Sequence, residues 1–185
     1  MSAYHVMLAH FPIALWSTAA LIVLIRFLSA GTIARAADGA LSFILFLGAV
    51  SGALTFAVGL MVWPFEAASS SPIARNHMIL AAWSLAYWTV LWLVRWRGGE
   101  AIWSGLWRWV MLGLMGLGIG LQTITGALGG YLVGNPSAIS NVLRAGGWEV
   151  YTTFYFPLWL VGTLVAAGLA LLAVAVMSRR SGQPT

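Results

Sequence analysis

The sequence has no cysteine and no lysine, and only 7% of its 185 residues are charged. The absence of cysteine excludes disulfides, thiolate metal sites, iron–sulfur clusters and covalent haem attachment. Histidine and methionine are then the soft ligands that the chain offers to a metal ion. The scarcity of charge excludes a soluble enzyme, because a soluble domain carries a much larger share of charged side chains.

Hydrophobic residues make up 61% of the chain and its mean hydropathy is +0.92, a profile typical of integral membrane proteins. Five apolar segments each approach the roughly 20 residues that a helix needs to cross a hydrocarbon layer of about 30 Å. They lie at about 8–28, 40–63, 74–94, 109–133 and 155–177. The chain is therefore expected to be all-α, an integral membrane bundle of five transmembrane helices that forms a single domain over residues 1–185.

Arginine placement predicts how this bundle is oriented. All the positively charged side chains behind the net charge of +5 are arginines, because the chain has no lysine. In so apolar a chain, this charge indicates membrane topology rather than binding to nucleic acid. Seven arginines fall on one side of the five segments, and only Arg75 and Arg144 fall on the other. Cytoplasmic loops are enriched in arginine, so the N-terminus is predicted to lie outside and the C-terminus in the cytoplasm.

The longest outer connection spans residues 135–153, between the fourth and fifth segments. Connections of this length more often have a function or a structure of their own than serve as unstructured linkers. We therefore expect this loop to form a short surface helix that caps the side of the bundle where the histidines lie.

All three histidines, His5, His10 and His77, lie at the predicted outer face. An ionisable side chain inside a membrane is costly without a partner, so it indicates a functional site. His77 falls in the second turn of its helix, and His10 lies near a helix end at a comparable depth. His5 is about 140° from His10 around a helix, so these two are not expected to face one metal ion together. The predicted pair of metal ligands is His10 with His77.

Arg75 and Arg144 lie on the outer side, where arginine is otherwise absent. Their presence there suggests a local role. A haem held near the outer surface would present its two propionates there, and arginine forms charge-assisted bonds with carboxylates. We therefore predict that both arginines contribute to a haem site. The alternative is that both are interfacial arginines whose guanidinium groups extend to water.

A family resemblance rests on three stretches of the chain. The opening run from His5 to Leu15 resembles the start of the bacterial domain of unknown function 2231 family, whose members begin with two histidines spaced in this way before a proline. Arg75-Asn76-His77 resembles the start of the family's third helix, and the run from Gly126 to Val133 resembles its glycine-rich fourth. The similarity covers residues 4–134, but the further histidine that commonly follows the glycine stretch is missing here. The resemblance implies a small, multi-pass protein of the bacterial inner membrane and implies no reaction.

Two classes of function fit these features. The first is a membrane-embedded b-type haem protein, in which His10 and His77 bind the iron of haem b and electrons pass between a periplasmic redox partner and a quinone or partner subunit. The second is a non-catalytic membrane anchor or assembly subunit of a larger complex, whose histidines only form hydrogen bonds. A transporter is disfavoured because intramembrane charge is scarce and no inverted repeat is evident.

Overall fold

The structure is a computed structural model that describes residues 2–149 and 158–181, and every element in these ranges is a helix. Five helices are long: α1 (Ser2–Leu28), α2 (Thr32–Val62), α4 (Pro72–Gly98), α5 (Trp107–Leu132) and α7 (Leu158–Ser181). Three are short: α3 (Phe65–Ser70), the 3₁₀ helix η1 (Gly99–Trp103) and α6 (Ala138–Ala145). Among the described residues, α1, α2, α4 and α5 are long and apolar enough to cross a membrane.

The long helices follow the predicted segments but extend past them. α1 and α2 begin six and eight residues before segments 8–28 and 40–63. The apolar pattern of α2 is interrupted by Asp38, yet the helix continues through it because this carboxylate is paired with Arg95 inside the protein. The first three residues of the predicted segment 155–177 lie outside the described residues, and its apolar part is described as Leu158–Val174 of α7.

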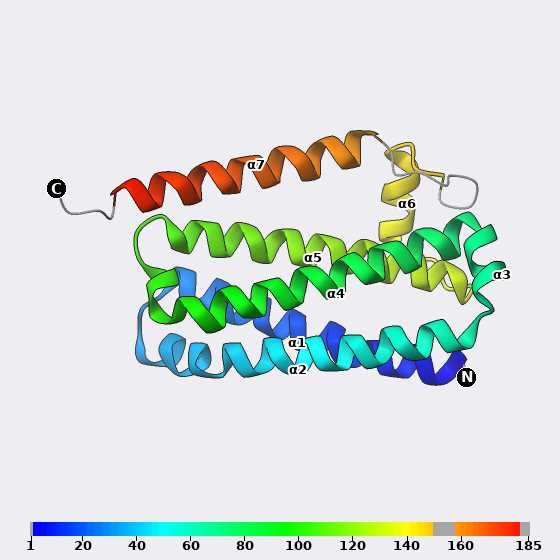
Figure 1. Cartoon of the computed structure of the whole chain (residues 1–185), viewed down its shortest axis with the longest axis horizontal. Helices are drawn as coiled ribbons and strands as arrows, with labels where there is room; N and C mark the ends of the chain where they lie inside the picture. Colours follow the sequence, from blue (N-terminus) through cyan, green and yellow to red (C-terminus); the bar gives the residue numbers. More distant parts are fainter. Residues whose placement is uncertain (1, 150–157, 182–185) are drawn as a thin grey trace.

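Four helices form a square bundle around a common core (Figure 1). α1 packs against α2 and α5, and α4 packs against the same two helices, so α1 and α4 occupy opposite corners. α7 lies alongside α5 on the outside of this square. α3 and α6 sit at one end of the bundle, here called the α3 end, and η1 sits at the other, called the η1 end (Figure 1). α6 confirms the expected short helix in the connection 135–153, of which residues 150–153 are not described.

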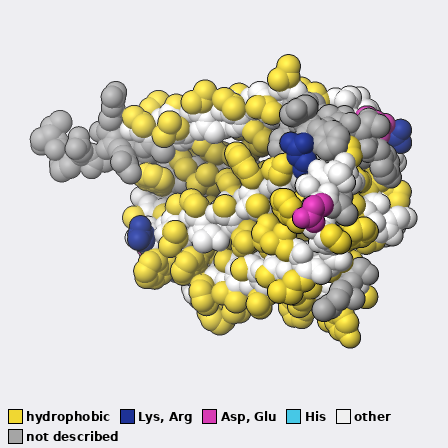
Figure 2. Space-filling view, turned by 45° about the vertical axis from the view of Figure 1, so that its right-hand side comes forward, with side chains coloured by type: hydrophobic (Ala, Val, Ile, Leu, Met, Phe, Trp, Pro, Cys, Tyr) yellow, Lys and Arg dark blue, Asp and Glu magenta, His cyan; other side chains and the backbone are white. Residues whose placement is uncertain are grey.

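The flank of the bundle is apolar, as a membrane helix requires. Figure 2 shows one such face, covered mainly by hydrophobic side chains with few charged ones among them. Exposed large hydrophobic residues occur on every long helix, and examples are Leu21, Phe43, Trp83, Trp109 and Leu169. Four of the helices can therefore lie in lipid with their polar backbone groups satisfied internally, which identifies a multi-pass membrane protein.

The hairpins α1–α2 and α4–α5 are related to each other in sequence. In the first helix of each hairpin a histidine, a leucine, two alanines and a tryptophan recur at one spacing: His5, Leu8, Ala9, Ala14 and Trp16, against His77, Leu80, Ala81, Ala86 and Trp88. In the second helix the matching sets are Leu47, Gly48, Thr55, Ala57 and Gly59, against Leu117, Gly118, Thr125, Ala127 and Gly129. Both hairpins start at the α3 end, so they form a parallel repeat whose relating axis runs along the bundle (Figure 1).

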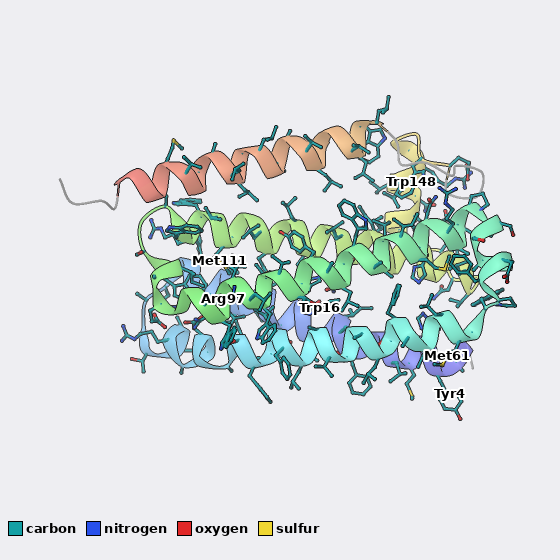
Figure 3. All side chains as sticks on the ribbon, viewed as in Figure 1. Tyr4, Trp16, Met61, Arg97, Met111 and Trp148 are labelled. Carbon is teal, nitrogen blue, oxygen red and sulfur yellow. The ribbon has the colours of Figure 1, made fainter. Side chains whose placement is uncertain are left out.

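The centre of the bundle shows this repeat in its packing. Trp16 and Trp88 come from opposite corners and stack with ring centroids 5.1 Å apart and planes 5° apart. A Cβ at Gly48 would overlap the Trp16 indole, and one at Gly118 would lie 2.9 Å from Trp88, so each indole needs its glycine. Figure 3 shows Trp16 in the middle of the bundle, between Met61 near the α3 end and Arg97 near the η1 end.

A buried ion pair closes the η1 end. Arg95 donates from Nε and Nη2 to the two carboxylate oxygens of Asp38 at 3.2 and 2.9 Å, and the indole N–H of Trp103 donates to the same carboxylate at 3.0 Å. The Asp38 residue is 1% exposed and Arg95 is 8% exposed. These bonds join α2, α4 and η1, and they satisfy a charge that would otherwise be buried at high cost.

Candidate functional site

Two histidines meet inside the α3 end of the bundle. His5 projects from α1 and His77 from α4, and their ring centroids lie 6.4 Å apart with planes at 89°. Both side chains are partly buried. Because α1 and α4 occupy opposite corners of the square, the two rings approach each other across its interior.

Each ring is held by a carbonyl of the neighbouring helix. The Nδ1–H of His5 donates to the carbonyl oxygen of Thr55 on α2 at 3.1 Å, and the Nδ1–H of His77 donates to that of Thr125 on α5 at 3.0 Å. A carbonyl only accepts, so in each ring Nδ1 carries the hydrogen. In a neutral ring this leaves the lone pair on Nε2, the arrangement that metal-binding histidines take when a carbonyl fixes their orientation.

A glycine one helical turn after each carbonyl makes room for the ring. A Cβ at Gly59 would lie 2.8 Å from Cε1 of His5, and a Cβ at Gly129 would lie 3.0 Å from Cε1 of His77. Ordinary contact of a Cβ begins at 3.4 Å, so any larger residue would displace either ring. Each half of the repeat thus supplies one imidazole, one carbonyl and one glycine.

The pair offers two ring nitrogens, fewer than a bare metal ion takes from a protein. The ring centroids, 6.4 Å apart with planes at 89°, have the geometry of an edge-to-face ring contact. Among the described residues, no group of three or more His, Asp or Glu side chains could hold a metal ion. Structural and catalytic zinc sites use three or four protein ligands, whereas haem iron needs only two axial ligands at most.

His10 lies apart from this pair. Its Nδ1–H donates to the carbonyl of Val6 in its own helix at 2.8 Å, and the ring is exposed on the outer side of α1. The structure therefore brings His77 together with His5 and leaves out His10, which the sequence had paired with it. The predicted angle of about 140° between His5 and His10 agrees with this result, since it turns one of them outward when the other faces inward.

The structure places the two predicted arginines on α6 and on α4. Nε of Arg144, in α6, donates to a carboxylate oxygen of Glu149 at 3.1 Å, and both side chains are about half exposed. The negative charge of Glu149 raises the pKa of the Arg144 guanidinium above its ordinary value. Arg75 stands in the first turn of α4, two residues before His77, and is partly buried. Arg144 thus already has a carboxylate partner within the chain.

Sequence reasoning passed over His5, the two threonine carbonyls and the two glycines that fit the rings. A backbone carbonyl leaves no trace in residue type, but the internal repeat was available as a signal. Aligning α1 with α4 superposes His5, not His10, on His77, and aligning α2 with α5 superposes Gly59 on Gly129.

The fold and the site together define a multi-pass helical membrane protein in which two histidines meet inside one end of a four-helix bundle. Comparisons of the chain with protein-family models, with curated proteins and with solved structures gave no match. The resemblance to the domain of unknown function 2231 family therefore stays a prediction.

Proposed function

We propose that the protein is a membrane-embedded b-type haem protein that carries electrons, in which His5 and His77 would bind the iron. The observation that carries this proposal is the meeting of two histidines from equivalent positions of the repeat, each with Nδ1 tied to a carbonyl. In helical bundles, cofactor sites are built in the core from side chains on facing helices. His5 replaces His10 in the pair predicted from the sequence.

The residues of the chain would hold and orient the group. When bound, haem b supplies reversible one-electron chemistry. The carbonyls of Thr55 and Thr125 fix both imidazoles and raise their basicity, which strengthens them as ligands. The apolar flank of the bundle keeps the site in a low-dielectric layer. Its partners would be a periplasmic redox protein on one side and a quinone or partner subunit on the other.

One of the two arginines keeps its proposed part at the site. Arg75 is near His77 in α4 and would offer a guanidinium to a haem propionate at the membrane surface. Arg144 lies on α6, where it binds Glu149, and it is not part of the proposed site. With its charge balanced in this way, the Arg144 guanidinium has less to gain from a second carboxylate.

The proposed orientation places the site at the periplasmic face of the bacterial inner membrane. α7 has 24 residues, and at 1.5 Å per residue it reaches about 36 Å, enough for a fifth span of a hydrocarbon layer of about 30 Å. With five spans and the arginine-rich η1 end in the cytoplasm, the N-terminus and the histidine pair lie outside.

The absorption spectrum of the purified protein tests the proposal. We expect a Soret band in the wild type, its loss in His5→Ala and in His77→Ala, and its retention in His10→Ala. Size-exclusion profiles of all four proteins must match, so that loss of haem is separated from loss of fold. A wild type that is colourless after expression with ample haem, while correctly folded, would instead support the anchor or assembly subunit.

A further inference from the structure

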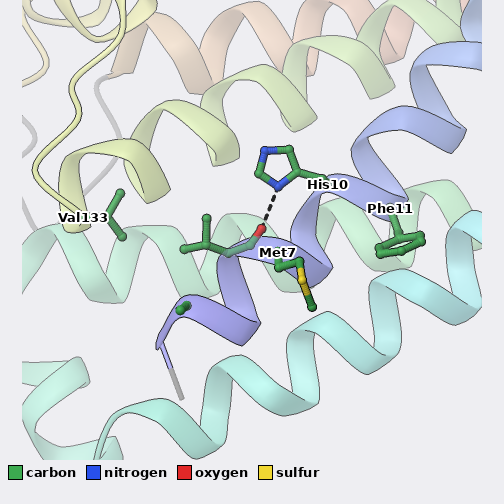
Figure 4. Close-up of a pocket in the computed structure, with 6 residues that line it drawn as sticks. Met7, His10, Phe11 and Val133 are labelled. Carbon is green, nitrogen blue, oxygen red and sulfur yellow. Dashed lines mark hydrogen bonds between the residues drawn. The ribbon is translucent and has the colours of Figure 1, made fainter.

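Two shallow, open hollows on the outer surface of α1 contain the remaining histidine. The two hollows adjoin and share His10 and Phe11, and we call them together the His10 groove. Val6, Met7 and Val133 line the first hollow, which Figure 4 shows with His10 and Phe11 beside it. Leu47, Leu54 and Ser51 of α2 line the second hollow.

His10 is a polar side chain in a place where lipid would surround it. It lies eight residues, or about 12 Å, from the start of α1, while this helix of 27 residues exceeds a hydrocarbon layer of about 30 Å by only about 5 Å at each end. Ionisable residues within membrane helices almost always face the bundle interior, where they find partners. His10 faces outward instead, so it needs a partner from the membrane.

The hydrogen bond of His10 decides what kind of partner fits. Because Nδ1–H donates to the carbonyl of Val6, the neutral ring presents Nε2 as an acceptor. Lipid tails have no hydrogen to donate. Phospholipid headgroups, which carry donors, lie at the bilayer surface, shallower than His10. Their phosphates also favour cationic partners, and none of the described residues that line the groove is an arginine. A partner that suits this groove has a flat or flexible apolar body and one hydroxyl donor.

We infer that the His10 groove binds the headgroup of an isoprenoid quinol, whose hydroxyl donates to Nε2 of His10. Phe11 and the aliphatic side chains of the two hollows would contact the ring and the isoprenoid tail, both of which are apolar. His10 is five residues from His5 on α1, about 7.5 Å along the helix axis. The inference rests on the proposed function, for which it names the membrane-soluble redox partner and the place where that partner binds.

Because Nε2 of His10 is an acceptor, the inference can be tested by comparing the binding of a quinol and of the corresponding quinone. A quinol can donate to Nε2, whereas the oxidised quinone has only acceptor oxygens. Decyl-ubiquinol and decyl-ubiquinone serve as probes for the purified full-length protein in lipid nanodiscs, with bound and free probe separated by ultrafiltration and quantified by chromatography. We expect the quinol to bind roughly tenfold more tightly than the quinone, the worth of one hydrogen bond to an acceptor that lipid tails leave unsatisfied.

Three variants test whether the acceptor at position 10 sets this preference. His10→Phe keeps the groove apolar and removes the acceptor, so it is expected to abolish the preference for quinol. His10→Gln supplies a carbonyl acceptor and also an N–H donor, so it should bind quinol and quinone with similar affinity. Met7→Leu, which changes the same hollow without changing polarity, should leave the preference as in the wild type. Equal affinities of wild type and His10→Phe for the quinol, or no quinol binding by the wild type, would overturn the inference.

The His5→Ala variant separates this inference from the proposed function. It lacks one proposed iron ligand but keeps the His10 groove, so it should lose the haem spectrum and still prefer the quinol. A wild type without haem that retains the His10-dependent preference would refute the haem proposal alone. A wild type with haem that shows no such preference would refute the quinol site alone.

Discussion

The contact of Gly59 with His5 gives the most quantitative prediction. In Gly59→Ala the new Cβ would lie 2.8 Å from Cε1 of His5, so the ring must retreat by about 0.6 Å to reach the 3.4 Å of an ordinary contact. Thr55 lies one turn before Gly59 on the same helix, so this movement stretches the bond from Nδ1 to its carbonyl from 3.1 Å to about 3.7 Å. A separation of that size is no longer a hydrogen bond.

Loss of such a supporting bond typically lowers metal affinity by about 10–100-fold, and we expect a decrease of this size in haem affinity for Gly59→Ala. In Gly129→Ala the ring of His77 needs to move by only about 0.4 Å, from 3.0 to 3.4 Å, and its 3.0 Å bond to Thr125 survives in weakened form. The expected order of haem affinity is therefore wild type, then Gly129→Ala, then Gly59→Ala.

Haem titration of the apoprotein, followed by the Soret band, measures this order. Gly126→Ala is the matched control, because a Cβ there would meet no atom within 4 Å. Alanine in place of glycine stabilises a helix interior by roughly 0.5–1 kcal/mol, so a general loss of stability is not expected from the substitution itself. Equal haem affinity in Gly59→Ala and Gly126→Ala would refute the role given to the His5–Thr55 bond.

Three further predictions concern the rest of the molecule. Asp38→Asn should lower the free energy of unfolding by about 3 kcal/mol, because it leaves the buried guanidinium of Arg95 with only the exposed Glu100 carboxylate, 4.0 Å away. Glu100→Gln, at a carboxylate whose side chain is 71% exposed, should cost less than about 1 kcal/mol in the same chemical denaturation assay. Arg75→Gln should shift the haem midpoint to lower potential, since a positive charge near the iron favours its reduced form. Arg144→Gln should leave the midpoint unchanged. Equal shifts of the two variants in a redox titration would refute the proposal that Arg75 is at the site and Arg144 is not. A phosphatase that is active only in the periplasm should be inactive when fused after Thr185, because this end of the chain is proposed to be cytoplasmic. An active fusion would refute the proposed orientation.

Much of the fold could be predicted from local properties of the sequence. Four of the five predicted apolar segments correspond to helices that can cross a membrane, and the connection 135–153 contains the expected short helix. Hydropathy reports these elements because each backbone polar group in a membrane helix is satisfied within its own segment. The ends were less predictable. α2 reaches back past Asp38, since its charge is neutralised by Arg95, a residue 57 positions later.

The candidate site was predictable only in part, because the sequence did not show how α1 is rotated about its own axis. Helical geometry showed that His5 and His10 could not face the same partner, but it did not say which one faces inward. His5 and Trp16 are eleven residues apart, about 20° around the helix, and Trp16 is buried at the centre of the bundle, so the two share the inner face. The predicted depth in the membrane favoured His10 as the partner of His77. Depth, however, does not determine how α1 is rotated about its axis.

The sequence by itself determined that the chain is an all-helical membrane protein with its histidines at one end, because composition and hydropathy act segment by segment. Only the tertiary structure decided that His5 meets His77, that a carbonyl on α2 and another on α5 hold the two rings, and that Arg144 binds Glu149. These contacts depend on how each helix is turned against its neighbours. That rotation is set by the packing of indoles on glycines across the bundle, which joins residues far apart in the chain.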